Sequence, residues 1–252
     1  MHLHDLLRTW RDEIVSKAPR VALAEDEVKL LRADQLVDRE RMTVPGKLRR
    51  DEREPVQATL FPARHEPNKP ASDDALDDLE AALDFTLPRP LELFLRLHDG
   101  GAFFMPDVAD LPEAVGRPLR ILSCAEMAEA YDELVMGVRA QLAELEPDDD
   151  DLVRIAGRFG CRGDGREAMV GELEAINEGA EAGLQLIPLV RAPGTRNYVV
   201  YAPHAGREGR VGYAFADAGY LPEDSMEFAF EGMEGWLKAI LDSRACKRIV
   251  LT

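Results

Sequence analysis

The segment SDDALDDLEAALDFTLPRPLELFLRLHDGGAFF, residues 72–104, predicts two short helices that meet at a proline. Ser72 is a favoured N-cap residue, and the aspartates after it place negative charge at the positive end of the first helix. Leucines at spacings of three and four residues give this helix one apolar stripe: Leu76, Leu79 and Leu83. The helix should end before Pro88, because proline disfavours the helical conformation at the preceding residue, Leu87.

The second helix of this segment should bury Leu91, Phe94 and Leu95 and stop at a pair of glycines. Gly100 and Gly101 can adopt the left-handed backbone that commonly closes a helix. None of these residues is a catalytic type. The segment therefore predicts a fold and says little about mechanism.

Upstream, residues 3–15 predict an amphipathic helix whose apolar face consists of Leu3, Leu6, Leu7, Trp10 and Ile14. This face could pack on the chain's own sheet or on a second copy. Residues 20–43 fit strand and helix equally well: 21–23 and 28–31 could form a small hairpin around Glu25-Asp26, and 33–41 could form a helical turn. Residues 44–71 contain five prolines and predict a linker or an extended segment that lies across the main domain.

Downstream, residues 119–122 predict a short strand, and Ser123 with Glu126 forms the capping box of a long helix. Pro147 should end this helix. The rest of the chain alternates strand-like runs with glycines, and the strand candidates are 152–159, 168–173, 184–190, 197–201 and 211–215. Residues 225–230 lead into a closing helix with the apolar face Met233, Trp236, Leu237, Ile240 and Leu241.

An acidic helix, a Leu-Pro corner, an Leu-x-x-Phe-Leu helix and an Asp-Gly-Gly turn follow one another here: Glu80, Leu83, Leu87, Pro88, Leu91, Phe94, Leu95, Asp99, Gly100 and Gly101. This order resembles the SUKH superfamily, which includes yeast regulators of cell-wall synthesis and many bacterial immunity proteins of toxin systems. The chain departs from the family pattern at Asp99, where asparagine is usual, and at Asp84, where a glycine is usual.

The resemblance continues to about residue 242, through a strand pair at 186–189 and 198–201 and a closing helix with its approach: Met226, Phe228, Phe230, Trp236 and Leu237. The family's glycine-aspartate turn fits Gly163-Asp164-Gly165 better than residues 194–197. The resemblance implies an α+β fold with helices packed on one face of a mainly antiparallel sheet. Residues 1–70 would be an N-terminal extension, an amphipathic helix plus a proline-rich linker, and residues 71–252 the SUKH-like domain.

Composition limits the cellular setting. No run approaches the length of a membrane span, and the first residues lack a basic region followed by an apolar one, so no secretory signal is expected. The three cysteines are far apart, so we expect a reduced, cytoplasmic protein.

The net charge of −17 is concentrated in one part of the chain. Residues 70–151 hold 21 acidic and 5 basic residues, whereas the segments on either side are close to neutral. Such a surface would repel nucleic acid and anionic lipid and attract a basic partner. A solvated, solubilising surface is the alternative interpretation.

No motif indicates an enzyme. Four adjacent aspartates at 148–151 lack the alternating ligands and the glycine of a calcium loop, and the loop at 162–165 lacks the Lys-Ser/Thr of a phosphate-binding motif. The five histidines form no zinc motif, and no Gly-x-Ser-x-Gly is present. Cys124 is expected to be a buried structural thiol. We therefore expect no enzymatic activity, no cofactor and no metal.

The resulting hypothesis is a non-enzymatic protein-binding domain, an immunity protein that blocks a basic, nuclease-type toxin by stoichiometric binding, with no nucleic-acid or membrane partner. The expected binding residues are Asp73, Asp74, Asp77 and Asp78 on the first helix of the segment, and Asp148, Asp149, Asp150 and Asp151 after the long helix. The alternative is a scaffold or regulator of cell-envelope or signalling processes that binds through an apolar groove beside the sheet.

Overall fold

The fold is described from a computed structural model. The structure describes residues 3–16, 18–36, 39–44, 55–108, 110–112, 115, 118–144, 171, 186–191, 197–203, 209–215 and 228–246. The aspartates at 148–151, the strand candidates at 152–159 and 168–173, and Gly163-Asp164-Gly165 lie outside these residues.

The strands form one antiparallel sheet in the order β1-β3-β4-β5-β6-β7-β8-β9, and β2 also pairs with β3. The strands are β1 (Arg20–Ala24), β2 (Glu40–Val44), β3 (Val56–Pro67), β4 (Gly101–Pro106), β5 (Leu119–Ile121), β6 (Ile187–Arg191), β7 (Asn197–Ala202), β8 (Arg210–Phe215) and β9 (Phe228–Glu231). β3 is the longest strand, and its two halves hold different partners. Its first half lies between β1 and β2, while its second half pairs with β4.

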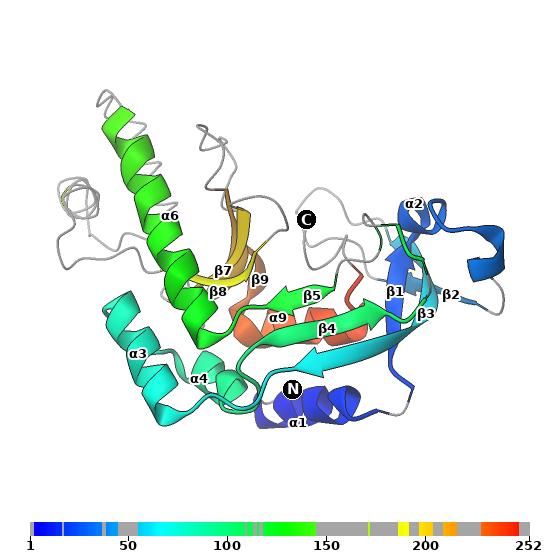
Figure 1. The fold of residues 1–252 in the computed structure, drawn as a ribbon, viewed down its shortest axis with the longest axis horizontal. Coiled ribbons are helices and arrows are strands. Elements are labelled where there is room, and N and C mark those ends of the chain that lie inside the picture. The colour runs from blue at the N-terminus through cyan, green and yellow to red at the C-terminus, as the bar shows by residue number, and fades with distance from the viewer. Residues whose placement is uncertain are drawn as a thin grey trace.

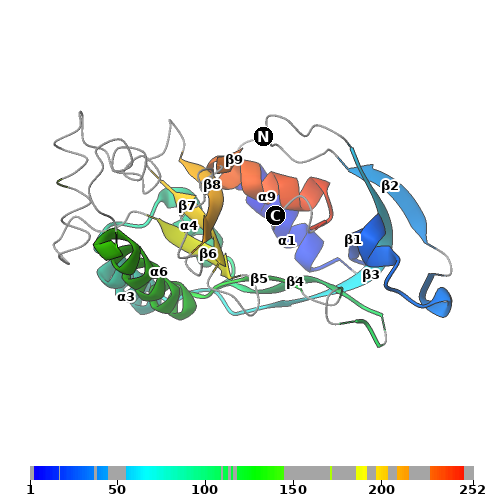
Figure 2. The same cartoon turned by 90° about the horizontal axis from the view of Figure 1, so that it is seen from above.

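The helices are α1 (Leu3–Ile14), α2 (Glu25–Val28), α3 (Asp73–Leu83), α4 (Arg89–Leu95), α6 (Cys124–Glu144) and α9 (Gly232–Asp242), with a 3-10 turn η1 at Ala33–Leu36. α1 and α9 lie side by side against the curled sheet (Figures 1 and 2), and α3 packs along α6 at one end of the molecule. The expected α+β fold is confirmed.

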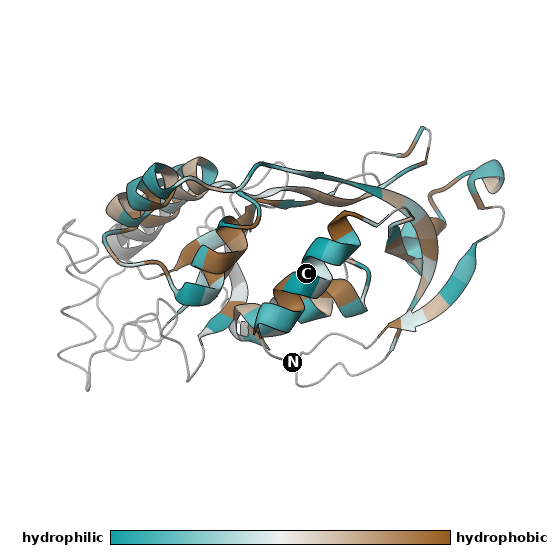
Figure 3. Cartoon of the chain, turned by 90° about the horizontal axis from the view of Figure 1, so that it is seen from below, coloured by the Kyte–Doolittle hydropathy of each residue, from teal (hydrophilic) through white to brown (hydrophobic). Residues whose placement is uncertain are grey.

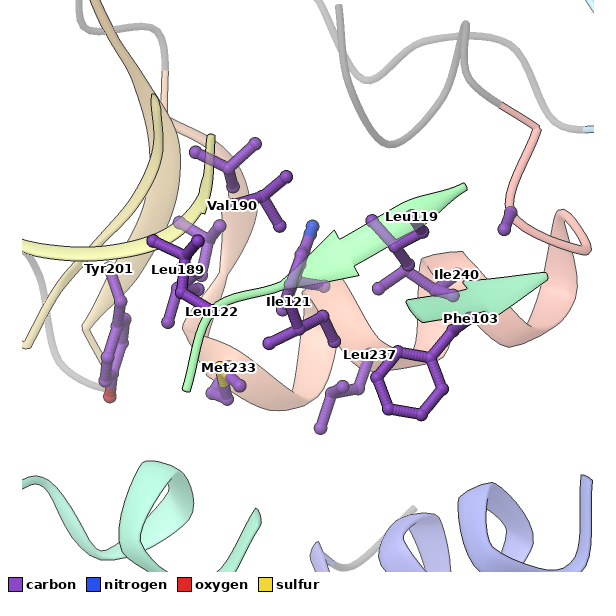
Figure 4. Close-up of a cluster of buried hydrophobic side chains, with 14 of the residues drawn as sticks. Phe103, Leu119, Ile121, Leu122, Leu189, Val190, Tyr201, Met233, Leu237 and Ile240 are labelled. Atoms are coloured by element: carbon purple, nitrogen blue, oxygen red, sulfur yellow. The ribbon is translucent and has the colours of Figure 1, made fainter. Parts of the chain in front are cut away.

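The core lies between the sheet and these helices. Met233, Leu237 and Ile240 of α9 pack with side chains of β4, β5 and β6 (Figure 4), and all are buried. Figure 3 shows that hydrophobic and hydrophilic residues alternate along the helices. This one-sided burial is what the apolar periodicity of a surface helix predicts.

The N-terminal helix packs on the chain's own core. Trp10 is fully buried, and its ring meets the edges of Phe94, Phe103 and Phe104 at centroid separations of 5.5, 5.1 and 6.2 Å. Of the two alternatives for the Leu/Trp stripe, packing on the same chain is the one observed. The division of the chain at residue 70 remains a prediction, and residues on both sides of it contribute to one hydrophobic core.

The hairpin alternative for residues 20–43 is wrong. Residues 20–24 pair with β3 instead of 28–31, and Glu25–Val28 is helical. In the proline-rich stretch, residues 56–67 form a strand, so the extended alternative holds there. Residues 228–231, expected as an approach to the closing helix, are the edge strand β9. The predicted strand pair of 186–189 with 198–201 is confirmed by the register of Ile187 with Tyr201.

Candidate functional site

The acidic helix α3 begins at the predicted Ser72 cap, but it ends at Leu83, before the Leu87-Pro88 step that was expected to stop it. The Ser72 hydroxyl accepts a hydrogen bond from the Ala75 N–H at 3.2 Å. Asp84, the C-cap residue, adopts a left-handed backbone with φ 58°. A glycine at this position would adopt that conformation without strain, which gives a physical reason for the residue usual in the family.

The four aspartates of α3 are all exposed, but they differ in their partners. Asp73 forms an ion pair with Arg96 of the neighbouring segment at 2.6 Å, and Arg96 also pairs with Glu92 at 2.8 Å. Asp74, Asp77 and Asp78 have no ion pair within the described residues. Three negative charges of α3 therefore face solvent without a partner among the described residues.

The packing of α6 beside α3 adds further carboxylates to the same end of the molecule (Figure 1). Glu129 and Asp132 are exposed on α6 and have no ion pair in the described part of the chain. Neither α3 nor residues 124–136 of α6 contain a lysine or arginine. We call Asp74, Asp77, Asp78, Glu129 and Asp132 the acidic face.

The sequence analysis missed Glu129 and Asp132. Their spacing of three residues, on the side of the helix opposite Met127, Ala130 and Leu134, was the signal that could have identified them. Met136 is 62% exposed on the same helix and adds an apolar side chain near these charges.

α6 is held against the fold at its first turn and again at Glu133, near the middle of the helix. The predicted capping box is confirmed, because the Ser123 N–H donates to Glu126 at 2.9 Å and the Glu126 N–H donates to the Ser123 hydroxyl at 3.3 Å. Further along, the Glu133 carboxylate accepts a hydrogen bond from the Tyr198 hydroxyl at 2.7 Å and pairs with Arg191 at 3.2 Å. These contacts fix α6 to β6 and β7.

The polar motif residues that carried the resemblance are structural. The Glu80 carboxylate accepts a hydrogen bond from the Leu87 N–H at 2.6 Å and so holds the Leu-Pro corner against α3. The Asp99 carboxylate accepts a hydrogen bond from the Cys124 N–H at 2.7 Å, at the first residue of α6. Asp99 therefore joins the glycine turn to a helix that begins 25 residues later.

Replacing Asp99 with alanine should destabilise the protein by about 1–2 kcal/mol, since it removes an acceptor from the positive end of a helix. Asp99→Asn keeps an acceptor oxygen and should cost less than about 1 kcal/mol. Urea denaturation followed by circular dichroism gives both values. Equal losses for the two variants would contradict a capping role.

The Cys124 thiol should be unreactive in the folded protein. Its side chain is 3% exposed, and burial together with the nearby Asp99 carboxylate raises its pKa to about 12. Cys246 is also fully buried. We expect a thiol reagent at pH 8 to modify Cys124 only after denaturant is added, with mass spectrometry of the peptides as the readout. Rapid modification of Cys124 in native buffer would show that the N-terminus of α6 opens.

Within the described residues, no group of three or more His, Cys, Asp or Glu side chains could hold a metal ion. His65 and His98 pack against Phe103. A search of the described helices found none with the length and hydrophobicity needed to cross a membrane.

Comparison with known proteins agrees with this architecture. The model of the SMI1 / KNR4 family (SUKH-1) matches residues 70–238, from the residues just before α3 into α9. The fold and this match show that the chain contains a SUKH domain, a class of protein-interaction module that is generally non-catalytic. The chain belongs to the SMI1 / KNR4 family. No curated protein matches the chain.

Proposed function

We propose that the protein is a cytoplasmic immunity protein that binds a basic, nuclease-type toxin through the acidic face and neutralises it by stoichiometric binding. The observation that supports the proposal is the set of exposed carboxylates, without ion pairs in the described part of the chain, on two helices that pack together. Membership of a family of interaction modules supports protein binding in general. Asp73 belongs to the proposed site as the residue that orients Arg96, and Asp148, Asp149, Asp150 and Asp151 would extend it.

Such a surface acts mainly on the rate of association. Carboxylates that face a basic partner accelerate encounter by long-range attraction, and salt weakens that attraction. The largely exposed Arg89–Glu92–Arg96 network extends from α4 and pairs with α3 only through Asp73, so it leaves the other aspartates of α3 unneutralised. The exposed side chain of Met136 would supply apolar contact once the partner has docked.

The test is a pull-down from the native host at low and moderate salt, with mass spectrometry of the retained proteins. A single basic toxin-like protein that elutes with salt is the expected result. Retention of envelope or signalling proteins, independent of salt, would contradict the immunity function and favour a scaffold or regulator.

The charge of the acidic face can be tested separately with a matched pair of triple variants. Asp74→Asn, Asp77→Asn and Asp78→Asn together should slow association with the retained partner roughly tenfold at low salt. The control removes the same number of exposed carboxylates elsewhere, through Glu25→Gln, Glu40→Gln and Glu66→Gln. Surface plasmon resonance measures both, and equal association rates for the two triple variants would refute docking at the acidic face.

A further inference from the structure

An irregular point in the sheet lies where β3 meets β4. Arg64 pairs with Met105 and Glu66 pairs with Ala102, so His65 alone faces two residues of β4, Phe103 and Phe104. Phe104 has φ 52°, a left-handed conformation that bulky residues rarely adopt. Bulges of this kind commonly redirect a side chain or mark a functional position.

The His65 ring holds this bulge in place. Its Nδ1 accepts a hydrogen bond from the Phe104 N–H at 3.1 Å, and the two rings meet edge to face at 4.8 Å. Nδ1 must therefore be unprotonated, which places the proton of the neutral ring on Nε2. Nε2 is buried and has no hydrogen-bond partner among the described residues. Burial lowers the pKa of His65, whereas the carboxylate of Glu13 on α1 raises it.

The Glu13 carboxylate, whose charge raises the pKa of His65, also binds the C-terminal turn. Its side chain is only 15% exposed and pairs with Arg244, just after α9, at 2.6 Å. Arg244 itself has φ 51°, and its carbonyl accepts a hydrogen bond from the Ala22 N–H of β1 at 3.0 Å. The Glu13–Arg244 pair therefore joins α1, β1 and the end of α9.

We propose that His65 is a proton-responsive residue that couples the β3–β4 bulge to the Glu13–Arg244 ion pair. A proton on Nδ1 abolishes the acceptor for the Phe104 N–H and creates a positive charge near Glu13. Glu13 then interacts with two cations, His65 and Arg244, so its ion pair with Arg244 weakens. The bulge and the C-terminal turn therefore become less stable together at low pH. The exposed neighbours Arg64 and Glu66 pair with each other at 3.6 Å and contribute little net charge.

The direction of the pH effect follows from the pKa of His65 being lower in the folded than in the unfolded protein. The unfolded state then binds more protons, so the stabilisation that neutral His65 contributes is fully present at pH above its pKa in the unfolded protein. This stabilisation is lost as the pH falls through the pKa of His65 in the folded protein. His98 packs on the same Phe103 ring, and burial also lowers its pKa, so it must be controlled for.

Histidine NMR and amide hydrogen exchange between pH 8 and pH 5 test the coupling in the full chain. Glu13→Gln should lower the titration midpoint of His65, and Arg244→Gln should raise it because Glu13 is freed. Protection of the Phe104 amide should fall as His65 titrates in the wild type. In His65→Asn, which keeps an acceptor near the Nδ1 position, that protection should no longer follow pH.

The control is His98→Asn, in which the Phe104 response should persist. If a variant does not fold, the wild-type protein still tests the geometry, because its neutral His65 must show the Nε2-protonated tautomer with Nδ1 as acceptor. A His65 midpoint that is insensitive to both Glu13→Gln and Arg244→Gln would overturn the proposal. So would a Phe104 response that survives in His65→Asn.

Discussion

Gly101→Ala is expected to destabilise the protein by about 3 kcal/mol or more, a large fraction of the stability of a typical domain. Gly101 has φ 129°, in a region that is nearly restricted to glycine. A Cβ at this position would lie 2.6 Å from the Glu66 carbonyl oxygen and 2.8 Å from the Cα of Pro67. Both neighbours are backbone atoms of β3, so the clash can be relieved only if the β3–β4 pairing shifts.

Gly235→Ala is the matched control for this substitution. Gly235 lies in α9, where an added Cβ would come no closer than 3.8 Å to Phe230, an ordinary contact. Alanine there should stabilise the protein by about 0.5–1 kcal/mol, because glycine is unfavourable within helices. Thermal and urea unfolding of both variants measure the difference. A Gly101→Ala protein as stable as the wild type would mean that β3 and β4 do not approach each other this closely.

These glycines show the limit of a sequence argument. The Gly100-Gly101 pair predicted a helix C-cap, but α4 ends at Leu95. Both glycines instead lie where the backbone of another segment comes too close to leave room for a side chain. An added Cβ at Gly100 would lie 2.5 Å from the Leu122 carbonyl oxygen. Which backbone approaches a glycine depends on pairing between distant segments, and no local pattern encodes it.

Local signals predicted the local structure well. The Ser72 cap, the capping box at Ser123 and the β6–β7 pair depend on residues close in sequence, and all three are present. β3 was ambiguous because Pro62 lies within it, and proline cannot donate to a ladder. The strand tolerates Pro62 because its carbonyl accepts the Asp107 N–H and the next residue, Ala63, donates to Pro19.

The candidate site likewise combines features that local sequence predicts with features that depend on tertiary packing. The exposure of Asp74, Asp77 and Asp78 followed from the periodicity of one helix. The ion pair of Asp73 with Arg96 and the addition of Glu129 and Asp132 required the packing of helices far apart in sequence. Charge distribution along the chain thus indicated the helices that carry the proposed site, while the selection of carboxylates without an ion pair in the described residues required the structure.

Trp10→Ala should reduce the stability by about 3–5 kcal/mol, the range for truncating a large buried aromatic side chain. The ring fills the space between α4 and β4, where it contacts Phe94, Phe103 and Phe104. All of these partners lie within residues 70–238, the part of the chain that the family model matches, whereas Trp10 lies outside it. The substitution therefore measures how far the family domain depends on the N-terminal helix.

Trp10→Phe is the control, and it should cost clearly less than the alanine variant, since it keeps most of the ring and removes an indole N–H that is buried without a partner in the described structure. For Trp10→Ala, urea unfolding is followed by circular dichroism and by the fluorescence of Trp236, the tryptophan that remains, in α9. The two signals distinguish a general loss of stability from separate unfolding of α1 and the family domain. A stability loss below about 1 kcal/mol for Trp10→Ala would show that α1 is dispensable to the core. A single transition shifted to low urea, seen equally at Trp236 and in the backbone signal, would show that α1 and the family domain fold as one unit.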